Sequence, residues 1–530
     1  MLNKETQTEQ KLRGGYYTPS PIAQYLWKWV YKKGYSSLLE PAAGDGALLR
    51  PIKEKSVKID AIEIFKSEAN KIKNSHTISQ QTNVYNTDFL AWYEEHSSNQ
   101  YDMLLSNPPY IRYQYLSPQQ RDIQSQILKK NGLRPNKLIN SWVPFVVAGI
   151  SMVKDGGRIG LVIPTDFLQV TYAKQLREFI SKQLQSLVII TFSENLFPGT
   201  QQDFLLLLGE KGKGSLKFKH ARIDNLNNLP AISTLSLEKP PSASSAKWTD
   251  LNLTYNERSY LQSIKANLIS SNTVAKTQVG ITTGANSFFS LTDNDVQKLH
   301  AKEFVKPLLG RSVSINSCFF NKQTLSLNSK LDQKIWLLDL NGYTLKQLPK
   351  ELQNYIEDAE NNEVNNAYKL RIRKVWYQIP NIWEPDAFLL RRIGNVPKLV
   401  LNETDGVSTD TFHRVNFADN INRSAVLISF YSSISLASLE LAGRSYGGGA
   451  LEILPGDLDS FYIPRIDYSS QINLDHELKN LDNLIRTNDI QKIASYADSV
   501  LINNFDFSFD YKQSQKILSH LQSIRTNKKS

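Results

Sequence analysis

The tetrapeptide Asn107-Pro108-Pro109-Tyr110 has residue types that suit a binding site for a flat, amine-bearing base. It follows the apolar run 101–105, which is short and bounded by a breaker, as in a buried strand of an α/β sheet. Two prolines end such a strand because each fixes φ near −65° and lacks a backbone N–H. The Asn107 amide and a proline carbonyl would then be rigid acceptors beside the Tyr110 ring. An ordinary Pro-Pro turn fits the same residues, so the tetrapeptide alone leaves both interpretations open.

A strand, a glycine turn and a helix come earlier in the chain. Glu40 ends the expected strand 37–40, and the turn Pro41-Ala42-Ala43-Gly44-Asp45-Gly46 leads directly into a helix from Ala47. This order is typical of the opening of a nucleotide-binding βαβ unit, in which glycines let the backbone approach a ligand.

Two further acids stand where the next strands are expected to end. Glu63 lies in the strand 58–64, beyond the glycine turn by roughly the 20 residues at which an acid meets ribose hydroxyls in such folds. Asp88 and Phe89 then place an acceptor beside an aromatic ring. An Asp-Phe pair is also an ordinary strand end, and it indicates a ligand site only when Asp88 is considered together with Glu40 and Glu63.

Strands and helices alternate over the first two-fifths of the chain, which predicts an α/β fold with a mostly parallel, doubly wound, Rossmann-like sheet. Residues 111–140 form a polar segment in this pattern, 154–157 a turn, and the alternation fades after 209–214. The other expected elements are helices at 22–33, 141–153 and 167–182, and strands at 158–163, 187–192 and 204–208.

The chain has 530 residues and exceeds the usual size of a single domain, so we expect two domains. The first spans 1–225, and a Pro-, Ser- and Asn-rich linker follows at 226–247. The second, at 248–530, has a mixed α+β pattern that ends in a helical region at 473–528.

Composition and charge narrow the classes of function. The net charge of +11 favours a polyanionic partner, because Lys and Arg replace the counterions of phosphates. The single cysteine, Cys318, excludes a disulfide framework and a cysteine-rich zinc site, and it fits a reducing compartment. The polar start 1–13 has no apolar core of a signal peptide, and no apolar run is long enough for a bilayer, so we expect a cytoplasmic protein without a membrane partner.

In type and order, these motifs resemble the gamma-type, S-adenosylmethionine-dependent N6-adenine DNA methyltransferases of restriction-modification systems, the Eco57I-like family. The resemblance rests on Tyr17-Thr18-Pro19, on the loop from Glu40 to Gly46, on the tetrapeptide from Asn107, and on Glu194-Asn195-Leu196-Phe197-Pro198-Gly199. In this family the cofactor half precedes the catalytic half, and the target-recognition domain comes last. The resemblance therefore implies that 1–225 binds the cofactor and catalyses methyl transfer, and that 248–530 recognises DNA.

The resemblance also implies roles for single residues. Catalysis is expected of Asn107, Pro108 and Tyr110, and stacking on the target base of Tyr110 and Phe197. Glu40 and the backbone near Gly44 would hold the methionine end of the cofactor, Glu63 its ribose, and Asp88 with Phe89 its adenine. The full set expected at the cofactor is Tyr17, Thr18, Glu40, Ala42, Gly44, Gly46, Glu63, Ile64, Asp88, Phe89 and Asn107.

The implied reaction transfers a methyl group from S-adenosylmethionine to the N6 amine of adenine and leaves S-adenosylhomocysteine, without a metal. The amine is a poor nucleophile because its lone pair is delocalised into the ring. The Asn107 side-chain oxygen and the Pro108 carbonyl can bind its two hydrogens and localise that lone pair, so catalysis needs chiefly positioning. A base inside a duplex cannot reach such a site, so it must flip out.

The carboxy-terminal half contains stretches that resemble the family's recognition domain, at 279–286, 371–377, 409–414 and 443–449. Basic residues interleaved with aromatics can contact phosphates, sugars and bases, although a solvated strand edge with a buried Trp-Tyr pair fits 371–377 nearly as well. The residues expected to contact DNA are Arg112, Arg371, Arg373, Lys374, Trp376, Tyr377, Arg444 and Tyr446. The expected partner is double-stranded DNA, bound by a monomer, and the resemblance allows for a cognate restriction endonuclease encoded nearby.

Two other functions remain open at the level of sequence. Asn-Pro-Pro-Tyr also resembles the motif of methyltransferases that modify RNA bases or protein glutamine, because a planar amide presents similar hydrogens. A DNA-binding specificity subunit with a degenerate methyltransferase fold would bind DNA without catalysis. A fused nuclease is a third idea, but the sequence contains no convincing carboxylate-lysine cluster for it.

Overall fold

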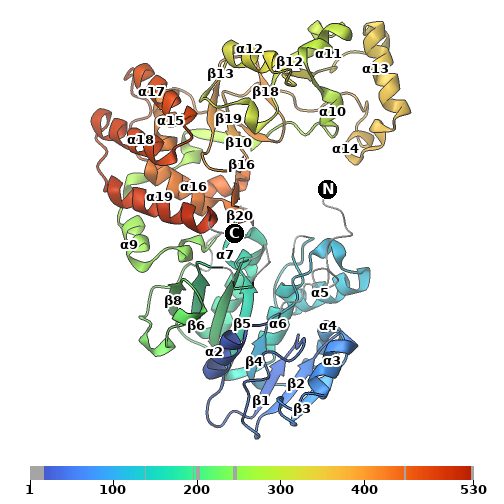
Figure 1. Ribbon diagram of the computed structural model, residues 1–530, viewed down its shortest axis with the longest axis vertical. Helices are drawn as coiled ribbons and strands as arrows, with labels where there is room; N and C mark the ends of the chain where they lie inside the picture. The colour runs from blue at the N-terminus through green and yellow to red at the C-terminus, as the bar shows by residue number, and fades with distance from the viewer. Residues whose placement is uncertain are drawn as a thin grey trace. The chain divides into compact units, whose positions relative to one another are not determined.

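The structure is a computed structural model that describes residues 17–137, 139–194, 196–197, 203–242, 247–446 and 449–526. The chain folds into two compact units, which divide between Tyr255 and Asn256 (Figure 1). The first unit is an α/β domain and the second a mixed α+β domain, which confirms the predicted fold class.

The first unit is built on an eight-stranded sheet with the order β3-β2-β1-β4-β5-β7-β6-β8. Neighbouring strands are parallel except for β7, which is antiparallel to both β5 and β6. Strand order reverses between β1 and β4, and ligands of such sheets bind at the carboxyl ends of the strands beside that point. The strands are β1 (Ser37–Glu40), β2 (Lys58–Ile62), β3 (Thr82–Tyr85), β4 (Tyr101–Ser106), β5 (Val153–Pro164), β6 (Leu184–Phe192), β7 (Phe204–Lys211) and β8 (Lys217–Ile223).

Helices cover both faces of this sheet, and alternate residues of each strand serve the two faces. In β4, Met103 and Leu105 belong to the apolar cluster of one face, whereas Leu104 belongs to that of the other. The first cluster includes α2 (Ser20–Val30) and α3 (Lys66–Lys73), and the second includes α4 (Phe89–His96), α5 (Pro118–Lys130), α6 (Trp142–Ser151), α7 (Asp166–Gln169) and α8 (Lys174–Gln183).

Several elements differ from those expected from the sequence. The polar segment 111–140 contains the helix α5, which begins with a capping box between Ser117 and Gln120. The single helix expected at 167–182 is broken at Val170, whose extended backbone separates α7 from α8. Residues 154–157 lie inside β5 instead of forming a turn between elements, and β8 was not anticipated.

The described residues of the segment expected as a linker pack on the first unit. The Tyr25 hydroxyl donates to the Pro230 carbonyl at 2.8 Å, and the Lys219 ammonium donates to the Ile232 carbonyl at 2.9 Å. The Glu238 amide donates to the Phe218 carbonyl, at the end of this segment. Residues 243–246, the last part of the expected linker except for Lys247, lie outside the described residues.

The described residues of the second unit form four sheets. A five-stranded sheet has the order β10-β19-β15-β17-β13, and a four-stranded sheet has the order β11-β14-β12-β18. Their strands are β10 (Ala275–Val279), β19 (Phe412–Phe417), β15 (Ala387–Leu390), β17 (Leu399–Asn402), β13 (Phe319–Phe320), β11 (Ser290–Leu291), β14 (Trp336–Leu338), β12 (Val305–Leu309) and β18 (Val407–Ser408). The smaller sheets contain β16 (Arg392–Ile393), β21 (Ala450–Glu452) and β20 (Arg444–Tyr446), and β22 (Tyr462–Pro464) with β9 (Leu268–Ser270).

The second unit also contains helices. The expected terminal helical region contains three helices, α17 (Asp475–Arg486), α18 (Ile490–Asn504) and α19 (Tyr511–Thr526). The others are α9 (Tyr255–Ser263), α10 (Asn286–Phe289), α11 (Asp293–Lys298), α12 (Lys322–Lys330), α13 (Lys350–Asn361), α14 (Tyr368–Arg371), α15 (Arg423–Tyr431) and α16 (Ser433–Ala442). No single helix in the described ranges is long and apolar enough to cross a membrane, although α15 and α16, bent by 73°, meet that test as a pair by length and composition.

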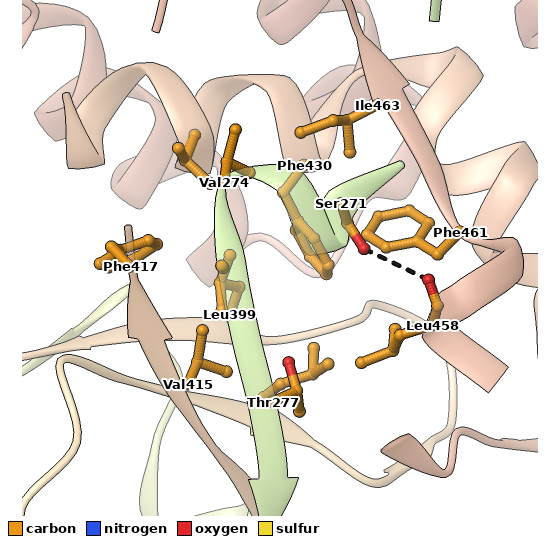
Figure 2. Close-up of a pocket in the computed structure, with 13 residues that line it drawn as sticks. Ser271, Val274, Thr277, Leu399, Val415, Phe417, Phe430, Leu458, Phe461 and Ile463 are labelled. Carbon is orange, nitrogen blue, oxygen red and sulfur yellow. Dashed lines mark hydrogen bonds between the residues drawn. The ribbon is translucent and has the colours of Figure 1, made fainter. Parts of the chain in front are cut away.

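A small apolar cavity of about 40 Å³ lies in the second unit, between the five-stranded sheet and the segment around α15 (Figure 2). Its lining includes Leu399, Phe430 and Phe461, and no titratable side chain is among the described residues that line it. Ser271 contributes a hydroxyl, which already donates to the Leu458 carbonyl at 3.5 Å. Because a bound water needs two to four polar partners, this cavity suits apolar packing and not chemistry.

A buried carboxylate joins three of the carboxy-terminal helices. Asp498 on α18 is 1% exposed, and its Oδ1 accepts a hydrogen bond from the Ser433 amide at the start of α16, at 2.9 Å. Its Oδ2 accepts from the Gln515 side chain on α19 at 3.0 Å. Burial raises the pKa of Asp498 to about 6, because these hydrogen bonds only partly offset the cost of desolvating the charge.

We expect Asp498→Asn to stabilise the protein above pH 6. A folded-state pKa of about 6 against an ordinary 3.8 means that the wild-type fold loses stability as the pH rises through this window, by at most about 3 kcal/mol. Asparagine keeps an acceptor for Ser433 and has no charge to bury, so its thermal midpoint should exceed that of wild type at pH 8 and match it below pH 4. Exposed Asp506→Asn is the control. A lower midpoint for Asp498→Asn at pH 8 would show that the charge stabilises the fold.

Candidate active site at the sheet edge

Four polar side chains stand at the carboxyl ends of neighbouring strands. Glu40 is the last residue of β1, Glu63 follows β2, Asp88 follows β3 and Asn107 follows β4. The four strands are parallel and adjacent in the order β3-β2-β1-β4, so the side chains share one edge of the sheet. Glu40 and Asn107 flank the point where strand order reverses, which is where this class of sheet binds its ligands.

Glu40 is a buried carboxyl group at the end of β1. Its side chain is fully buried, and neither carboxylate oxygen makes a hydrogen bond of ordinary geometry within the described part of the chain. Burial raises the pKa of Glu40 well above its usual range, the Ala42 amide opposes this by less, and the charge of Glu63 adds to it. Because an uncompensated buried carboxylate is costly, this position favours a ligand with a cationic group.

Glu63 holds the glycine turn against the end of β2. Its Oε2 accepts from the Gly44 amide and its Oε1 from the Phe65 amide, both at 2.8 Å. Burial raises the pKa of Glu63, and these two amides oppose the shift. The turn is tight at Gly46, where φ is +82° and an added Cβ would lie 2.4 Å from Ile78 Cδ1. The positive φ strongly favours glycine there, so backbone conformation helps to set the path of the loop.

Tyr17 lies beside the same loop. An added Cβ on Gly44 would be 3.9 Å from the Tyr17 ring, and this ring is 44% exposed. The Tyr17 hydroxyl donates to Glu68 Oε2 at 3.0 Å, which anchors the ring to α3. The loop from Glu40 to Gly46 is thus bordered by an accessible aromatic face.

Asp88 caps the start of α4, and the two residues expected to bind adenine, Asp88 and Phe89, lie in different surroundings. Asp88 Oδ1 accepts from the Leu90 amide at 2.8 Å, and its Oδ2 accepts from Gln120 on α5 at 3.4 Å. Phe89 is only 2% exposed and its ring contacts Phe145 at 5.2 Å, so it belongs to the core. Ile64, in contrast, is 49% exposed.

Two hydrogen bonds orient the Asn107 amide. Its Oδ1 accepts from the Tyr110 hydroxyl at 2.6 Å, and its Nδ2 donates to Thr18 Oγ1 at 3.2 Å. The distances fit this orientation, because O–H···O bonds are shorter than N–H···O bonds. The Tyr110 oxygen also lies 2.8 Å from the Val162 carbonyl on β5, and because a phenol has one hydrogen it donates to only one of these two acceptors at a time. Thr18 therefore holds the amide nitrogen, and the amide oxygen can accept a second hydrogen bond elsewhere.

Ser141 fixes the second half of the tetrapeptide. Its hydroxyl donates to the Pro109 carbonyl at 2.5 Å and accepts from the Ile111 amide at 2.8 Å. Within the described residues, no backbone amide donates to the Pro108 carbonyl. The Asn107 amide oxygen and the Pro108 carbonyl thus remain a predicted pair of acceptors.

The two aromatic residues expected to stack on a base, Tyr110 and Phe197, both pack against Phe204. The Tyr110 ring lies 5.0 Å from that of Phe204, which in turn contacts the Phe197 ring edge-on at 4.7 Å. Tyr110 is half-buried and Phe197 is 5% exposed. Residues 195, 198 and 199 of the Glu194-to-Gly199 motif lie outside the described residues. Stacking of Tyr110 and Phe197 on a target base stays a prediction.

The residues expected to contact DNA fall into two groups. Arg112, Arg371 and Lys374 are exposed. Arg373 instead donates to the carbonyls of Thr282, Thr283 and Trp376, and Arg444 pairs with Asp457 at 3.2 Å. Trp376 and Tyr377 are half-buried against an apolar cluster, and the Tyr446 side chain lies outside the description.

Sequence reasoning missed three groups at the site. Ser141 and the Val162 carbonyl fix the tetrapeptide from distant elements, and nothing in the local sequence marks them. Gln120 reaches Asp88 from α5. Its helix could have been found from the Ser-x-x-Gln spacing of a capping box at 117–120. In the described ranges, no group of three or more His, Cys, Asp or Glu side chains could hold a metal ion.

Comparison with known proteins places this geometry in a family. The model of the Eco57I restriction-modification methylase matches residues 32–197, and that of the C-terminal domain of the type II methyltransferase M.Eco57I matches residues 245–502. The chain belongs to the Eco57I-like family of restriction-modification methylases. The two matched regions contain the sheet-edge site and most of the second unit, so the resemblance seen in the motifs is confirmed.

Individual relatives agree with this assignment. The type II methyltransferase M.AccI of Acinetobacter calcoaceticus is 25% identical over 468 residues, which cover 84% of each chain. M.HincII of Haemophilus influenzae is 28% identical over 231 residues, 42% of this chain and 41% of the relative. Among solved structures, the type IIL restriction-modification enzyme MmeI in complex with DNA has a TM-score of 0.56 at 11% identity, over 98% of this chain and 80% of MmeI, which supports the fold.

The site residues fit S-adenosylmethionine, the cofactor that membership in this methylase family implies. Its ammonium and sulfonium groups are cationic, and Glu40 offers a buried carboxylate whose oxygens lack ordinary hydrogen bonds among the described residues. Gly46 gives the loop a tight path that a Cβ would block, and Tyr17 supplies an accessible ring beside it.

We expect Thr18→Val to lower turnover more than cofactor binding. Valine keeps the shape of threonine but lacks the oxygen that holds Asn107 Nδ2, so the amide should lose its orientation and kcat should fall by roughly tenfold to a hundredfold. The KM for S-adenosylmethionine should change little, and Thr18→Ser should restore kcat. Weakened cofactor binding with normal kcat at saturation would instead assign Thr18 to the cofactor.

Proposed function

We propose that the protein is a site-specific DNA methyltransferase that transfers a methyl group from S-adenosylmethionine to the N6 amine of adenine in duplex DNA. The observation that carries this proposal is the orientation of Asn107, whose nitrogen is held by Thr18 and whose oxygen lies on the side of Tyr110. An oriented amide oxygen beside a proline carbonyl is a pair of acceptors suited to an exocyclic amine.

The protein's residues would perform the reaction by positioning. Asn107 Oδ1 and the Pro108 carbonyl accept the two amine hydrogens, which favours a tetrahedral nitrogen with a localised lone pair. The Tyr110 hydroxyl and Thr18 keep the Asn107 amide in place. S-adenosylmethionine, when bound, supplies an electrophilic methyl group. No covalent enzyme intermediate is needed.

The cofactor would be held along the sheet edge. Glu40 would face its cationic methionine end, Glu63 its ribose hydroxyls and Asp88 its adenine amine. Ile64 is an exposed apolar side chain that can pack on the adenine ring, a role for which the buried Phe89 is less suited. Glu63 already accepts hydrogen bonds from two backbone amides. Its carboxylate has further lone pairs that could accept from the ribose hydroxyls.

Duplex DNA is the substrate that the other properties favour. The net charge of +11 suits a polyanion, the matched relatives are named as type II methyltransferases, and the matched family model is named as a restriction-modification methylase. The target adenine would flip out of the duplex to reach Asn107, at a cost of a few kcal/mol that binding offsets. We further propose that the protein acts in the cytoplasm as a monomer, and that it protects host DNA from a cognate restriction endonuclease.

Modification-sensing sequencing of DNA from cells that express the chain tests the substrate and the recognised site. Digestion of the same DNA to nucleosides followed by mass spectrometry should yield N6-methyladenine. The N4 amine of cytosine could bind the same two acceptors, so N4-methylcytosine alone would refute the choice of base. Methylation of RNA or of a peptide glutamine, with none on DNA, would refute the substrate class.

We expect Asn107→Ala to abolish methyl transfer and to leave cofactor binding largely intact. The substitution removes the acceptor for the target amine, whereas Glu40, Glu63 and Asp88 remain. Calorimetry with S-adenosylmethionine and a methylation assay on DNA from expressing cells measure the two effects. Near-normal turnover in Asn107→Ala would refute the assignment. If wild type fails to bind the cofactor, a degenerate DNA-binding subunit becomes the better interpretation.

We expect Glu40→Gln to weaken S-adenosylmethionine binding by about tenfold at pH 8 and to remove its pH dependence. Burial raises the pKa of Glu40 and a cationic ligand would lower it again, so wild-type affinity should rise as the pH rises and the carboxyl ionises. Calorimetry in buffers of different ionisation enthalpy should detect the released proton. Exposed Glu94→Gln is the control. An unchanged pH dependence in Glu40→Gln would exclude Glu40 as the linked group.

A further inference from the structure

The segment 368–374, with the sequence Tyr-Lys-Leu-Arg-Ile-Arg-Lys, exposes most of its side chains in the second unit. Tyr368 is 65% exposed and Ile372 is 62% exposed, which is unusual for two large apolar side chains so close together. The cations Lys369, Arg371 and Lys374 are exposed around them, and none forms an ion pair with a described residue. We call these five side chains the α14 surface.

The remaining two side chains of the segment point inward and anchor it. Leu370 is fully buried in the apolar cluster that also contains Phe288 and Leu352. The Arg373 guanidinium lies 5.6 Å from the Phe289 ring and donates to three backbone carbonyls, at 2.7 to 3.2 Å. Desolvation lowers the pKa of Arg373, as expected for a cation used inside the protein.

The loop that follows β10 supports the segment from a second side. Two of the three carbonyls bound by Arg373 belong to Thr282 and Thr283 in this loop. At Gly284, φ is +81° and an added Cβ would lie 3.0 Å from both Lys369 Cβ and Leu370 Cδ2. The backbone of the loop therefore lies directly against α14, and the exposed side chains stand on a rigid base.

The charges within the segment that carries the α14 surface are positive. From Val364 to Trp383 the sequence contains four Lys or Arg residues and no Asp or Glu. Three acids flank this stretch: Glu360 is bound by the Trp376 indole at 2.7 Å, Glu384 pairs with Lys306 at 2.7 Å, and Glu363 is exposed. An unpaired positive surface with apolar side chains between its charges matches a partner that presents phosphates around stacked, partly apolar groups.

We propose that the α14 surface docks on duplex DNA, with Arg371 and Lys374 at phosphates and with Tyr368 and Ile372 packed against sugars or base edges in a groove. Aromatic and aliphatic side chains make such contacts with deoxyribose, thymine methyl groups and partly unstacked bases. Arg373, Trp376 and Tyr377, which the family resemblance placed at DNA, serve as the scaffold of this surface. The inference rests on the proposed function, because it names the part of the protein that engages the same substrate.

The cations are tested with the full-length chain, a labelled mixed-sequence duplex and fluorescence anisotropy at several salt concentrations. The double variant Arg371→Ala/Lys374→Ala should bind about tenfold more weakly and should lower the slope of log affinity against log salt by about 2. The control Lys479→Ala/Lys512→Ala removes the same charge from exposed positions on α17 and α19, and it should leave the slope unchanged. Equal slopes for the two double variants would overturn the proposal.

The apolar side chains are tested by methylation of the recognised site. Tyr368→Ala and Ile372→Ala should each lower kcat/KM for DNA about tenfold without changing the salt slope or the affinity for S-adenosylmethionine. Leu331→Ala, at a position that is 69% exposed on a different segment, is the matched control and should behave as wild type. Normal kcat/KM for both variants would overturn their role. Wild-type protein that neither binds nor methylates DNA would refute the proposed function itself, whereas wild-type activity with unaffected variants refutes only the α14 surface.

Discussion

The chemistry assigned to this protein depends on which way one amide faces. An asparagine side chain can bind an amine only if its oxygen, and not its nitrogen, is turned toward it. Thr18 and Tyr110 impose that orientation on Asn107 from opposite sides of the amide. Thr18 lies just before α2, and the Tyr110 oxygen lies 2.8 Å from the Val162 carbonyl on β5, so both residues meet Asn107 only when the sheet has assembled. The assembled fold therefore fixes the orientation of the Asn107 amide.

The second constraint is the burial of acidic side chains at the site, which lowers the stability of the folded protein. Glu40 ends strand β1 and Glu63 follows the neighbouring strand β2, and each has its pKa raised by burial. Glu63 offsets part of this cost through two backbone amides, whereas Glu40 has no hydrogen bond of ordinary geometry within the described chain. A site that is costly when empty and favourable with a cationic ligand couples cofactor binding to the stability of the loop around it.

The sequence predicts the sheet and its edge well, because both follow from local patterns. Apolar runs indicate the strands, and Gly46 indicates a turn whose positive φ favours glycine. Because strands alternate with helices, the strands are parallel, and Glu40, Glu63 and Asp88 lie at one edge of the sheet. The same reasoning fails where the deciding contacts are distant. Phe89 looks available for a ring contact in the sequence, but the packing of α4 buries it against Phe145. Ser141 carries no local signal at all, and only the tertiary structure shows that it fixes the Pro109 carbonyl.

The second unit shows why a motif of basic and aromatic residues does not by itself identify a binding surface. Arg371, Arg373 and Lys374 are equivalent in the sequence, yet Arg373 uses its guanidinium on three carbonyls of its own chain. A guanidinium with five donors can organise a loop or meet a phosphate, and the outcome depends on whether backbone carbonyls are within reach. Burial of Leu370 and Arg373 turns the intervening side chains outward. Residues that anchor this short segment therefore alternate with residues that form its exposed surface. Only the packing of the inward residues shows which are which.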